Sequence, residues 1–202
     1  GVMVSNAAEA LGMRVIGYDP FISVESAWGL AREVERANTL EALLKQSDYV
    51  TLHVPLNDDT RGMINSASIS AMRPGSRLLN FARGALVDDS AVVAALDSGR
   101  LGRYVTDFPA PVLASHPSVL PVPHLGASTA EAEENCAVMA ARQVRSYLEE
   151  GNIRNSVNFP HCEMASATDQ RILVANRNIP NMVGQITTIL AQHKINIADL
   201  LN

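Results

Sequence analysis

The chain has few cysteines, no excess of positive charge and no long apolar run, and each shortage excludes a class of protein. Its two cysteines, Cys136 and Cys162, lie too far apart in the sequence for a metal pair, and they suggest neither a disulfide scaffold nor a redox motif. The formal net charge of -5 provides no basic footprint for nucleic acid. No apolar stretch approaches the roughly 20 residues that a membrane helix needs, and the first residues lack a signal-peptide pattern. We therefore expect reduced thiols, a cytoplasmic location, and neither a nucleic-acid nor a membrane partner.

The chain does have enough apolar sequence to bury a core. Hydrophobic residues make up 47% and charged residues 18% of its 202 residues, and the charged share is below average. A chain of this length holds one full domain and part of another.

Helix-like and strand-like segments alternate over the first half of the chain. The pattern predicts strands at 14–18, 49–54, 76–82 and 104–106, and helices at 2–11, 39–45, 65–72 and 88–96. Gly12 follows the first helix at the C′ position, and Thr39 and Asp88 are expected helix caps. Such alternation is typical of an α/β fold with a doubly wound parallel sheet.

The second half of the chain opens with a long predicted helix that ends at Gly151. Ser128 and Glu131 have the spacing of a capping box at its start. A polar, irregular stretch follows over residues 152–169. The pattern then predicts a strand at 171–175, a helix at 180–192 and a strand at 195–201.

The start of the chain fits part of a dinucleotide-binding fold. Such a fold begins with a strand and a G-x-G-x-x-G turn, and an acidic residue follows the next strand. The spacing of Gly1 and Asp19 fits if Gly1 is the third glycine, with the first strand and two glycines preceding residue 1. Asp19 would then bind the adenosine ribose and favour NAD over NADP. The alternative is that Gly1 has no such role and that Asp19 caps a turn before Pro20.

Two runs carry groups suited to a 2-hydroxy or 2-keto acid. They are Leu-Asn-Phe-Ala-Arg-Gly-Ala-Leu-Val-Asp over residues 79–88 and Pro-His-Leu-Gly-Ala-Ser-Thr over residues 123–129. The guanidinium of Arg83 can grip a carboxylate in a fork. The imidazole of His124 can take or give a hydroxyl proton near neutral pH.

These runs resemble the signature of the D-isomer-specific 2-hydroxyacid dehydrogenases, and the likeness covers nearly the whole chain. It implies a Rossmann-like NAD-binding domain over residues 1–126 that lacks its first strand, and a long helix over 127–151 that returns to a substrate domain absent from the chain. It further implies a linker over 152–169 and a partial ACT (ferredoxin-like) regulatory domain over 170–202.

The resemblance also implies roles for individual residues. Arg83 would bind the substrate carboxylate, and His124 would act as the acid and base. Asp107 would receive the nicotinamide carboxamide, unless it only caps a turn. Arg83 and His124 are implied to contact the cofactor as well. The other implied cofactor-binding residues are Gly1, Asp19, His53, Pro55, Thr60, Phe81, Ala82, Gly126 and Ala127, with His53 open to a purely structural reading. No metal site is implied.

One segment departs from the family pattern. The family has D-x-F-x-x-E-P, and its glutamate hydrogen-bonds the catalytic histidine. Here the segment is Asp107-Phe108-Pro109-Ala110-Pro111, and no glutamate occurs between Asp107 and His124. Either His124 works without this partner or another carboxylate supplies it.

The activity implied is NAD-dependent oxidation of 3-phospho-D-glycerate to 3-phosphohydroxypyruvate, the first step of L-serine biosynthesis. The alternatives are another D-2-hydroxyacid dehydrogenase, acting on glyoxylate, hydroxypyruvate or D-lactate, and a non-catalytic NAD-sensing module. Asn178 and Asn196 are candidate contacts for an L-serine effector, or turn and cap residues. We expect a homo-oligomer, a dimer or tetramer, and expect this chain alone to bind NAD weakly and turn over little.

Overall fold

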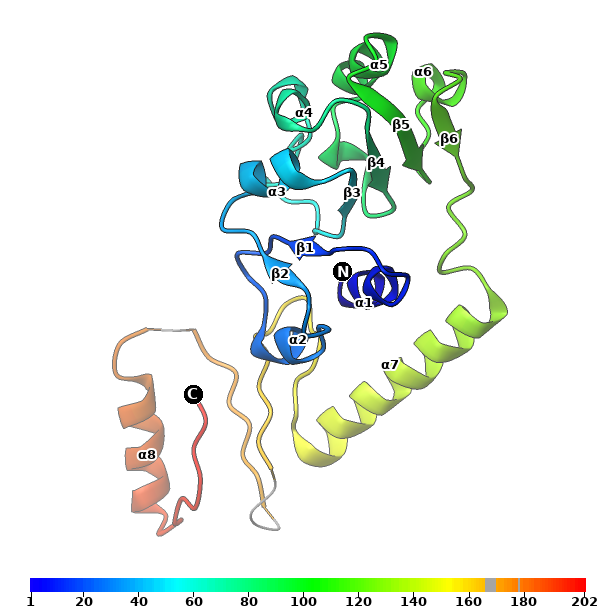
Figure 1. Ribbon diagram of the computed structural model, residues 1–202. Coiled ribbons are helices and arrows are strands. Elements are labelled where there is room, and N and C mark those ends of the chain that lie inside the picture. The colour runs from blue at the N-terminus through cyan, green and yellow to red at the C-terminus, as the bar shows by residue number, and fades with distance from the viewer. Residues whose placement is uncertain (166–169, 178) are drawn as a thin grey trace. The chain divides into compact units, whose positions relative to one another are not determined.

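The structure is a computed structural model that describes residues 1–165, 170–177 and 179–202. The chain forms two compact units, Gly1–His124 and Leu125–Asn202 (Figure 1). The boundary falls two residues before the one predicted from the sequence.

The first unit is built on parallel strands, as predicted. A four-stranded sheet has the order β3-β4-β5-β6, and a separate two-stranded sheet pairs β1 with β2. All of these pairs are parallel. The strands are β1 (Ile16–Gly17), β2 (Glu35–Arg36), β3 (Tyr49–Leu52), β4 (Ser76–Asn80), β5 (Leu101–Thr106) and β6 (Val119–Pro121). Because carboxyl ends of parallel strands point the same way, the loops after β3 to β6 emerge at one edge of the sheet.

Helices connect these strands, which confirms the α/β alternation. They are α1 (Val2–Ala10), α2 (Val24–Trp28), α3 (Leu40–Gln46), α4 (Ser66–Ala71), a 3₁₀ turn (Gly84–Leu86), α5 (Asp89–Asp97) and α6 (Pro111–Ala114). The predicted caps are present: the Thr39 side chain accepts from the backbone N–H of Ala42, and Asp88 accepts from Ser90 and Ala91. Gly12 follows α1 with a φ of +81°, a conformation that glycine adopts without steric cost.

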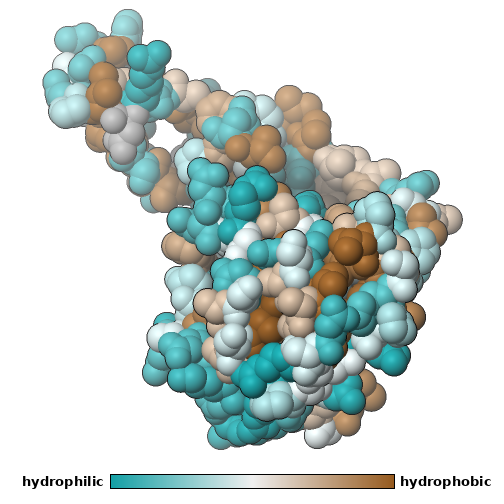
Figure 2. Space-filling view, turned by 90° about the horizontal axis from the view of Figure 1, so that it is seen from above, coloured by the Kyte–Doolittle hydropathy of each residue, from teal (hydrophilic) through white to brown (hydrophobic). Residues whose placement is uncertain are grey.

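The core lies where the four-stranded sheet meets α3, α4 and α5, which neighbour one another in Figure 1. Its largest fully buried apolar side chains are Leu44, Ile64, Met72, Leu78, Leu86, Val92, Leu101, Tyr104 and Leu113. The near face in Figure 2 is the end of this unit that carries α4, α5 and α6, and it mixes hydrophilic side chains with smaller apolar groups. Burial of the core side chains named above stabilises the fold.

The described residues of the second unit form two helices, α7 (Ala130–Glu150) and α8 (Met182–Gln192). Gly151 ends α7 in the left-handed conformation, as predicted. The start of α7 differs by one residue, since Thr129 rather than Ser128 is the N-cap and its side chain accepts from the N–H of Ala132. Either hydroxyl can cap a helix, and here the residue with an extended backbone next to the first turn does so.

The two strands predicted after residue 170 are wrong. The described residues of 171–175 and 195–201 form neither strand nor helix. A strand is stable only when a neighbour completes its hydrogen-bond ladder, and these segments form no ladder with any other described residue. The helix predicted at 180–192 is confirmed as α8. The ACT domain itself stays a prediction.

Candidate active site

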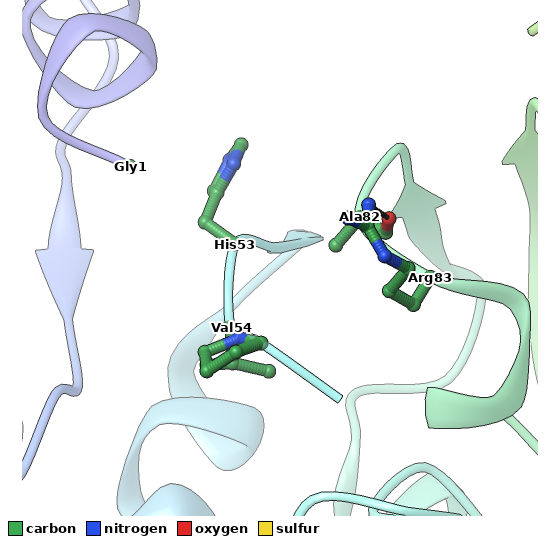
Figure 3. A pocket seen from close by; sticks show the side chains of 6 residues that line it. Gly1, His53, Val54, Ala82 and Arg83 are labelled. Atoms are coloured by element: carbon green, nitrogen blue, oxygen red, sulfur yellow. Dashed lines mark hydrogen bonds between the residues drawn. The ribbon is translucent and has the colours of Figure 1, made fainter. Parts of the chain in front are cut away.

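A cleft of about 310 Å³ lies at the carboxyl ends of β3 and β4. Figure 3 shows Gly1 and Arg83 at opposite ends of it, with His53 between them. In parallel α/β sheets, ligands bind beyond the carboxyl ends of the strands. The residues that line the cleft are Gly1, His53, Val54, Pro55, Ala82 and Arg83. The structure thus brings together five of the predicted site residues, Gly1, His53, Pro55, Ala82 and Arg83.

Gly1 places the start of α1 at this cleft. It is the N-cap of the helix, and its carbonyl accepts the first helical bond from the N–H of Ser5 at 2.9 Å. A Cβ built on Gly1 would lie 3.7 Å from the Cβ of His53, so the backbone passes close to the loop after β3. The unpaired N–H groups at a helix start favour an anion, which suits a pyrophosphate.

Asn80 fixes the loop that carries Arg83. Its side chain is fully buried at the end of β4. Its Nδ2 donates to the backbone carbonyl of Arg83 at 2.9 Å, and its Oδ1 accepts from the N–H of Ala82 at 3.1 Å. Sequence reasoning gave Asn80 no role. The available signal was a polar amide ending an otherwise apolar strand, since buried polar groups are rarely left unpaired.

The guanidinium of Arg83 is not held by an acid. Its Nη1 donates to the carbonyl of Ala82 at 2.6 Å, and no carboxylate in the described part of the chain forms an ion pair with it. A guanidinium has five N–H donors. Most of that capacity remains for a bound carboxylate.

His124 is held from two sides. Its Nδ1 lies 2.7 Å from Oδ2 of Asp107, which follows β5. The ring of Phe108 packs against the imidazole, with centroids 4.6 Å apart and planes tilted by 48°. The side chain of His124 stays 58% exposed, whereas that of Asp107 is 11% exposed. The imidazole is therefore held through Nδ1, while much of the side chain remains exposed to solvent.

Gly84 lies where the loop after β4, which carries Arg83, approaches the loop after β5, which carries Phe108. A Cβ built on Gly84 would lie 3.3 Å from the Cβ of Phe108, closer than ordinary contact. Phe108 in turn contacts His124. Gly84 therefore lets the loop after β4 approach the loop after β5, and a side chain at that position would press on the residue that supports the imidazole.

Asp107 retains an unused acceptor that fits the predicted cofactor. Its Oδ1 is buried and has no hydrogen-bond partner among the described residues. A buried carboxylate oxygen without a donor is costly. The amide group of a nicotinamide is such a donor, so the residues present are compatible with NAD.

The remaining residues after β1 and β3 hold turns. Oδ1 of Asp19 accepts from the N–H of Phe21 at 2.8 Å, which is the geometry of the turn-cap alternative, and its ribose role stays a prediction. The Thr60 hydroxyl donates to the carbonyl of Pro55 at 2.7 Å and accepts from the N–H of Asn57 at 2.9 Å. These bonds shape the loop that borders the cleft.

His53 directly follows β3 and lines the cleft. Partial burial lowers the pKa of His53. Its Nε2 lies 3.0 Å from the Thr51 hydroxyl. His53 thus lines the cleft mainly as a neutral ring near pH 7.

The structure does not bring every predicted residue to the cleft. Phe81 is exposed beside it. Gly126 and Ala127 belong to the second unit, as does Asn196, which is exposed. Asn178 lies outside the described residues. The described residues contain no cluster of side chains suited to a metal ion, and none of their helices is long and apolar enough to cross a bilayer.

Curated relatives match almost the whole chain. D-3-phosphoglycerate dehydrogenase of Escherichia coli K12 is 36% identical over 209 residues, which cover 98% of this chain and 50% of the relative. D-3-phosphoglycerate dehydrogenase 2 of Saccharomyces cerevisiae is 33% identical over 219 residues, covering 96% of this chain and 46% of the relative. The chain thus spans about half the length of the curated relatives it matches.

Solved structures of several dehydrogenases share the fold. A glyoxylate reductase from Paecilomyes thermophila superposes with a TM-score of 0.66 at 30% identity, covering 77% of this chain and 48% of that one. Rhodotorula graminis D-mandelate dehydrogenase gives 0.62 at 30% identity, covering 70% and 43%.

The family model for the NAD binding domain of D-isomer specific 2-hydroxyacid dehydrogenases matches residues 1–126. This range coincides with the first domain predicted from the sequence, and it contains the strands, the cleft and the Asp107–His124 pair described above. The chain therefore belongs to the D-isomer specific 2-hydroxyacid dehydrogenase family and carries that family's NAD binding domain.

Proposed function

We propose that this protein catalyses the NAD-dependent oxidation of 3-phospho-D-glycerate to 3-phosphohydroxypyruvate, the first step of L-serine biosynthesis. One observation carries the proposal. The imidazole of His124 is held through Nδ1, and the guanidinium of Arg83 has no acid partner among the described residues. Phe108 lies close to Gly84, the residue after Arg83, and also contacts His124. The choice of substrate is supported by the D-3-phosphoglycerate dehydrogenases that the chain resembles.

In this proposal Arg83 binds the carboxylate of the substrate and His124 acts on its C2 hydroxyl. Arg83 grips the carboxylate through paired N–H donors and draws electron density from the neighbouring C2 centre. His124 takes the C2 hydroxyl proton on Nε2 during oxidation and returns it during reduction. The chemistry that NAD supplies when bound is acceptance of the C2 hydride.

The residues proposed to hold NAD follow the edge of the sheet. Gly1 offers the helix start to the pyrophosphate, and Asp19 offers a carboxylate to the ribose. Asp107 offers its unpaired Oδ1 to the carboxamide. The others are His53 and Pro55 on the adenine side, Thr60, the backbone of Phe81 and Ala82, and Gly126 and Ala127.

A second candidate is oxidation or reduction of a different 2-hydroxy or 2-keto acid. The structural neighbours favour it, because they include a glyoxylate reductase and a D-mandelate dehydrogenase. A non-catalytic NAD-sensing module is less well supported, since such a module needs neither a free arginine nor an anchored histidine.

The proposal for the rest of the chain follows the family resemblance. Residues 170–202 are proposed to be part of an ACT domain that binds L-serine near Asn178 and Asn196. Helix α8 lies within the range where the sequence predicts a helix. A homo-oligomer in the cytoplasm is the proposed state of the protein.

The test is NADH consumption with 3-phosphohydroxypyruvate, using this chain joined to the N-terminal segment of the Escherichia coli relative. We expect turnover that is lost in Arg83→Ala and in His124→Ala while NADH still binds. Turnover with glyoxylate but not with 3-phosphohydroxypyruvate would favour the second candidate. NADH binding without turnover on either substrate would favour the binding module.

A further inference from the structure

The carboxylate that contacts His124 belongs to an aspartate rather than to the glutamate that the family resemblance implies. No glutamate occurs between Asp107 and His124, yet Nδ1 of His124 lies 2.7 Å from a carboxylate oxygen of Asp107. We propose that Asp107, besides its proposed contact with the nicotinamide amide, is the positioning residue for His124. The inference rests on the proposed function for its catalytic consequence, but not for the contact itself.

The contact determines which nitrogen of His124 carries the proton. An ionised carboxylate only accepts hydrogen bonds, so Nδ1 must carry the hydrogen that fills the 2.7 Å contact. In the neutral imidazole the lone pair is then on Nε2. That nitrogen is free of the carboxylate and is the one able to take a hydroxyl proton.

The local structure holds Asp107 in place for this task. Thr106 ends β5 fully buried, and its Oγ1 accepts from the N–H of Phe108 at 3.0 Å. This bond tightens the turn so that Asp107 and Phe108 meet the same imidazole, one through Oδ2 and the other through its ring. The shortened segment therefore retains a support that needs no glutamate.

The two oxygens of Asp107 have different surroundings, which permits two uses. Oδ2 is paired with His124, whereas Oδ1 is buried and has no donor among the described residues. A carboxylate can accept from two donors at once. One side chain can thus set the histidine and the nicotinamide relative to each other.

The first test reads the His124 tautomer directly, by ¹⁵N NMR of the imidazole in the 202-residue chain, with the resonance assigned through His124→Gln. We expect the Nδ1–H tautomer in the unsubstituted chain. In Asp107→Asn the side-chain amide can donate to Nδ1, so the population shifts to Nε2–H. An unchanged tautomer in that variant overturns the inference.

Asp97→Asn is the matched control. Oδ1 of Asp97 lies 3.2 Å from Nε2 of His116, so this pair is a second aspartate–histidine contact in the same unit. The substitution is expected to change the His116 signals and leave those of His124 unchanged. Unperturbed signals from the other histidines show that each variant is folded.

The second test uses the chain joined to the Escherichia coli N-terminal segment. Asp107→Asn is expected to lower kcat by on the order of 10²- to 10⁴-fold, the usual contribution of acid–base catalysis, with a smaller effect on the KM for the 2-keto acid. Asp107→Glu retains an acceptor and is expected to recover part of the loss. If both variants keep full kcat, Asp107 does not position His124.

The two tests separate this inference from the proposed function. A tautomer change without turnover in the unsubstituted protein supports the Asp107–His124 contact and rejects the dehydrogenase. Full turnover in the unsubstituted protein, with tautomer and kcat unchanged in Asp107→Asn, supports the dehydrogenase and rejects the inference.

Discussion

The buried amide of Asn80 donates to the backbone carbonyl of Arg83 at 2.9 Å. The same side chain accepts from the N–H of Ala82 at 3.1 Å, so it replaces two backbone partners that the chain loses where β4 ends. A residue three positions away, inside the sheet, thereby determines the path of the loop that presents the guanidinium.

Asn80→Ala is therefore expected to damage both stability and catalysis. Removing the amide takes one hydrogen bond from the N–H of Ala82 and one from the carbonyl of Arg83, which still accepts from the N–H of Leu86 at 3.3 Å, and each lost bond costs roughly 0.5–1.5 kcal/mol. We expect a lower free energy of unfolding in urea and a lower kcat/KM for 3-phosphohydroxypyruvate. Asn38→Ala, at an exposed position of the same unit, is the control. A variant with unchanged kcat/KM would show that the Arg83 loop does not depend on Asn80.

Gly84→Ala tests the contact between the two loops. Its Cβ would lie 3.3 Å from the Cβ of Phe108, and a Cβ cannot move aside without its backbone. We expect overpacking to cost roughly 1–3 kcal/mol in the free energy of unfolding and to lower kcat through a displaced His124.

The control for Gly84→Ala is Gly17→Ala in β1, where an added Cβ meets nothing within 4 Å. Thermal unfolding and NADH consumption measure both variants. If Gly84→Ala keeps the kcat of the unsubstituted protein while Gly17→Ala does the same, the loops are not coupled through Phe108.

In the first unit, the features that depend only on neighbouring residues could be predicted from the sequence. Thr39 and Asp88 cap α3 and α5 because a side-chain oxygen next to a helix start needs no distant partner. Strands β3 and β4 and the last three residues of β5, each with buried apolar side chains, were also predicted. The exposed strand β2 (Glu35–Arg36) was missed, because only its backbone pairing with β1 makes it a strand.

The site was predicted by residue type but not by contact. Asp107 and His124 are 17 positions apart, and they meet because β5 and β6 are neighbours in the sheet. Strand β6 has no clear signal in the sequence, because it is short and has a proline at its end. Without that strand, the aspartate could not be recognised as the partner of the histidine.

We expect the buried phenol of Tyr104 to make the free energy of unfolding decrease at alkaline pH. Burial raises the pKa of the Tyr104 phenol, although bonds to Thr106 and Asn80 oppose the shift. The unfolded chain loses this proton near pH 10, whereas the folded chain keeps it to higher pH. The unfolded state then binds fewer protons, so the free energy of unfolding decreases as pH rises above about 10.

Tyr104→Phe removes the ionisable phenol, and its alkaline loss of stability should be smaller. Denaturant unfolding at several pH values between neutral and alkaline measures the difference, and ultraviolet absorbance follows phenol ionisation. Tyr147→Phe is the control, since that ring is 48% exposed. Equal alkaline slopes for the two variants would contradict the prediction.

Arg83→Lys tests whether the substrate carboxylate needs a fork or only a charge. Lysine keeps the positive charge but cannot donate two parallel N–H bonds from a planar group. Loss of one charged hydrogen bond, about 1.5–3 kcal/mol, corresponds to a fall in kcat/KM of about 10- to 150-fold.

Arg145→Lys in α7, where the arginine pairs with Glu149 on the surface, is the control for a general effect of the exchange. Since Arg83 has no acid partner among the described residues, the loss should appear only with substrates that carry a carboxylate, and NADH affinity should stay unchanged. A fall in NADH affinity equal to the fall in kcat/KM would instead assign Arg83 to the cofactor.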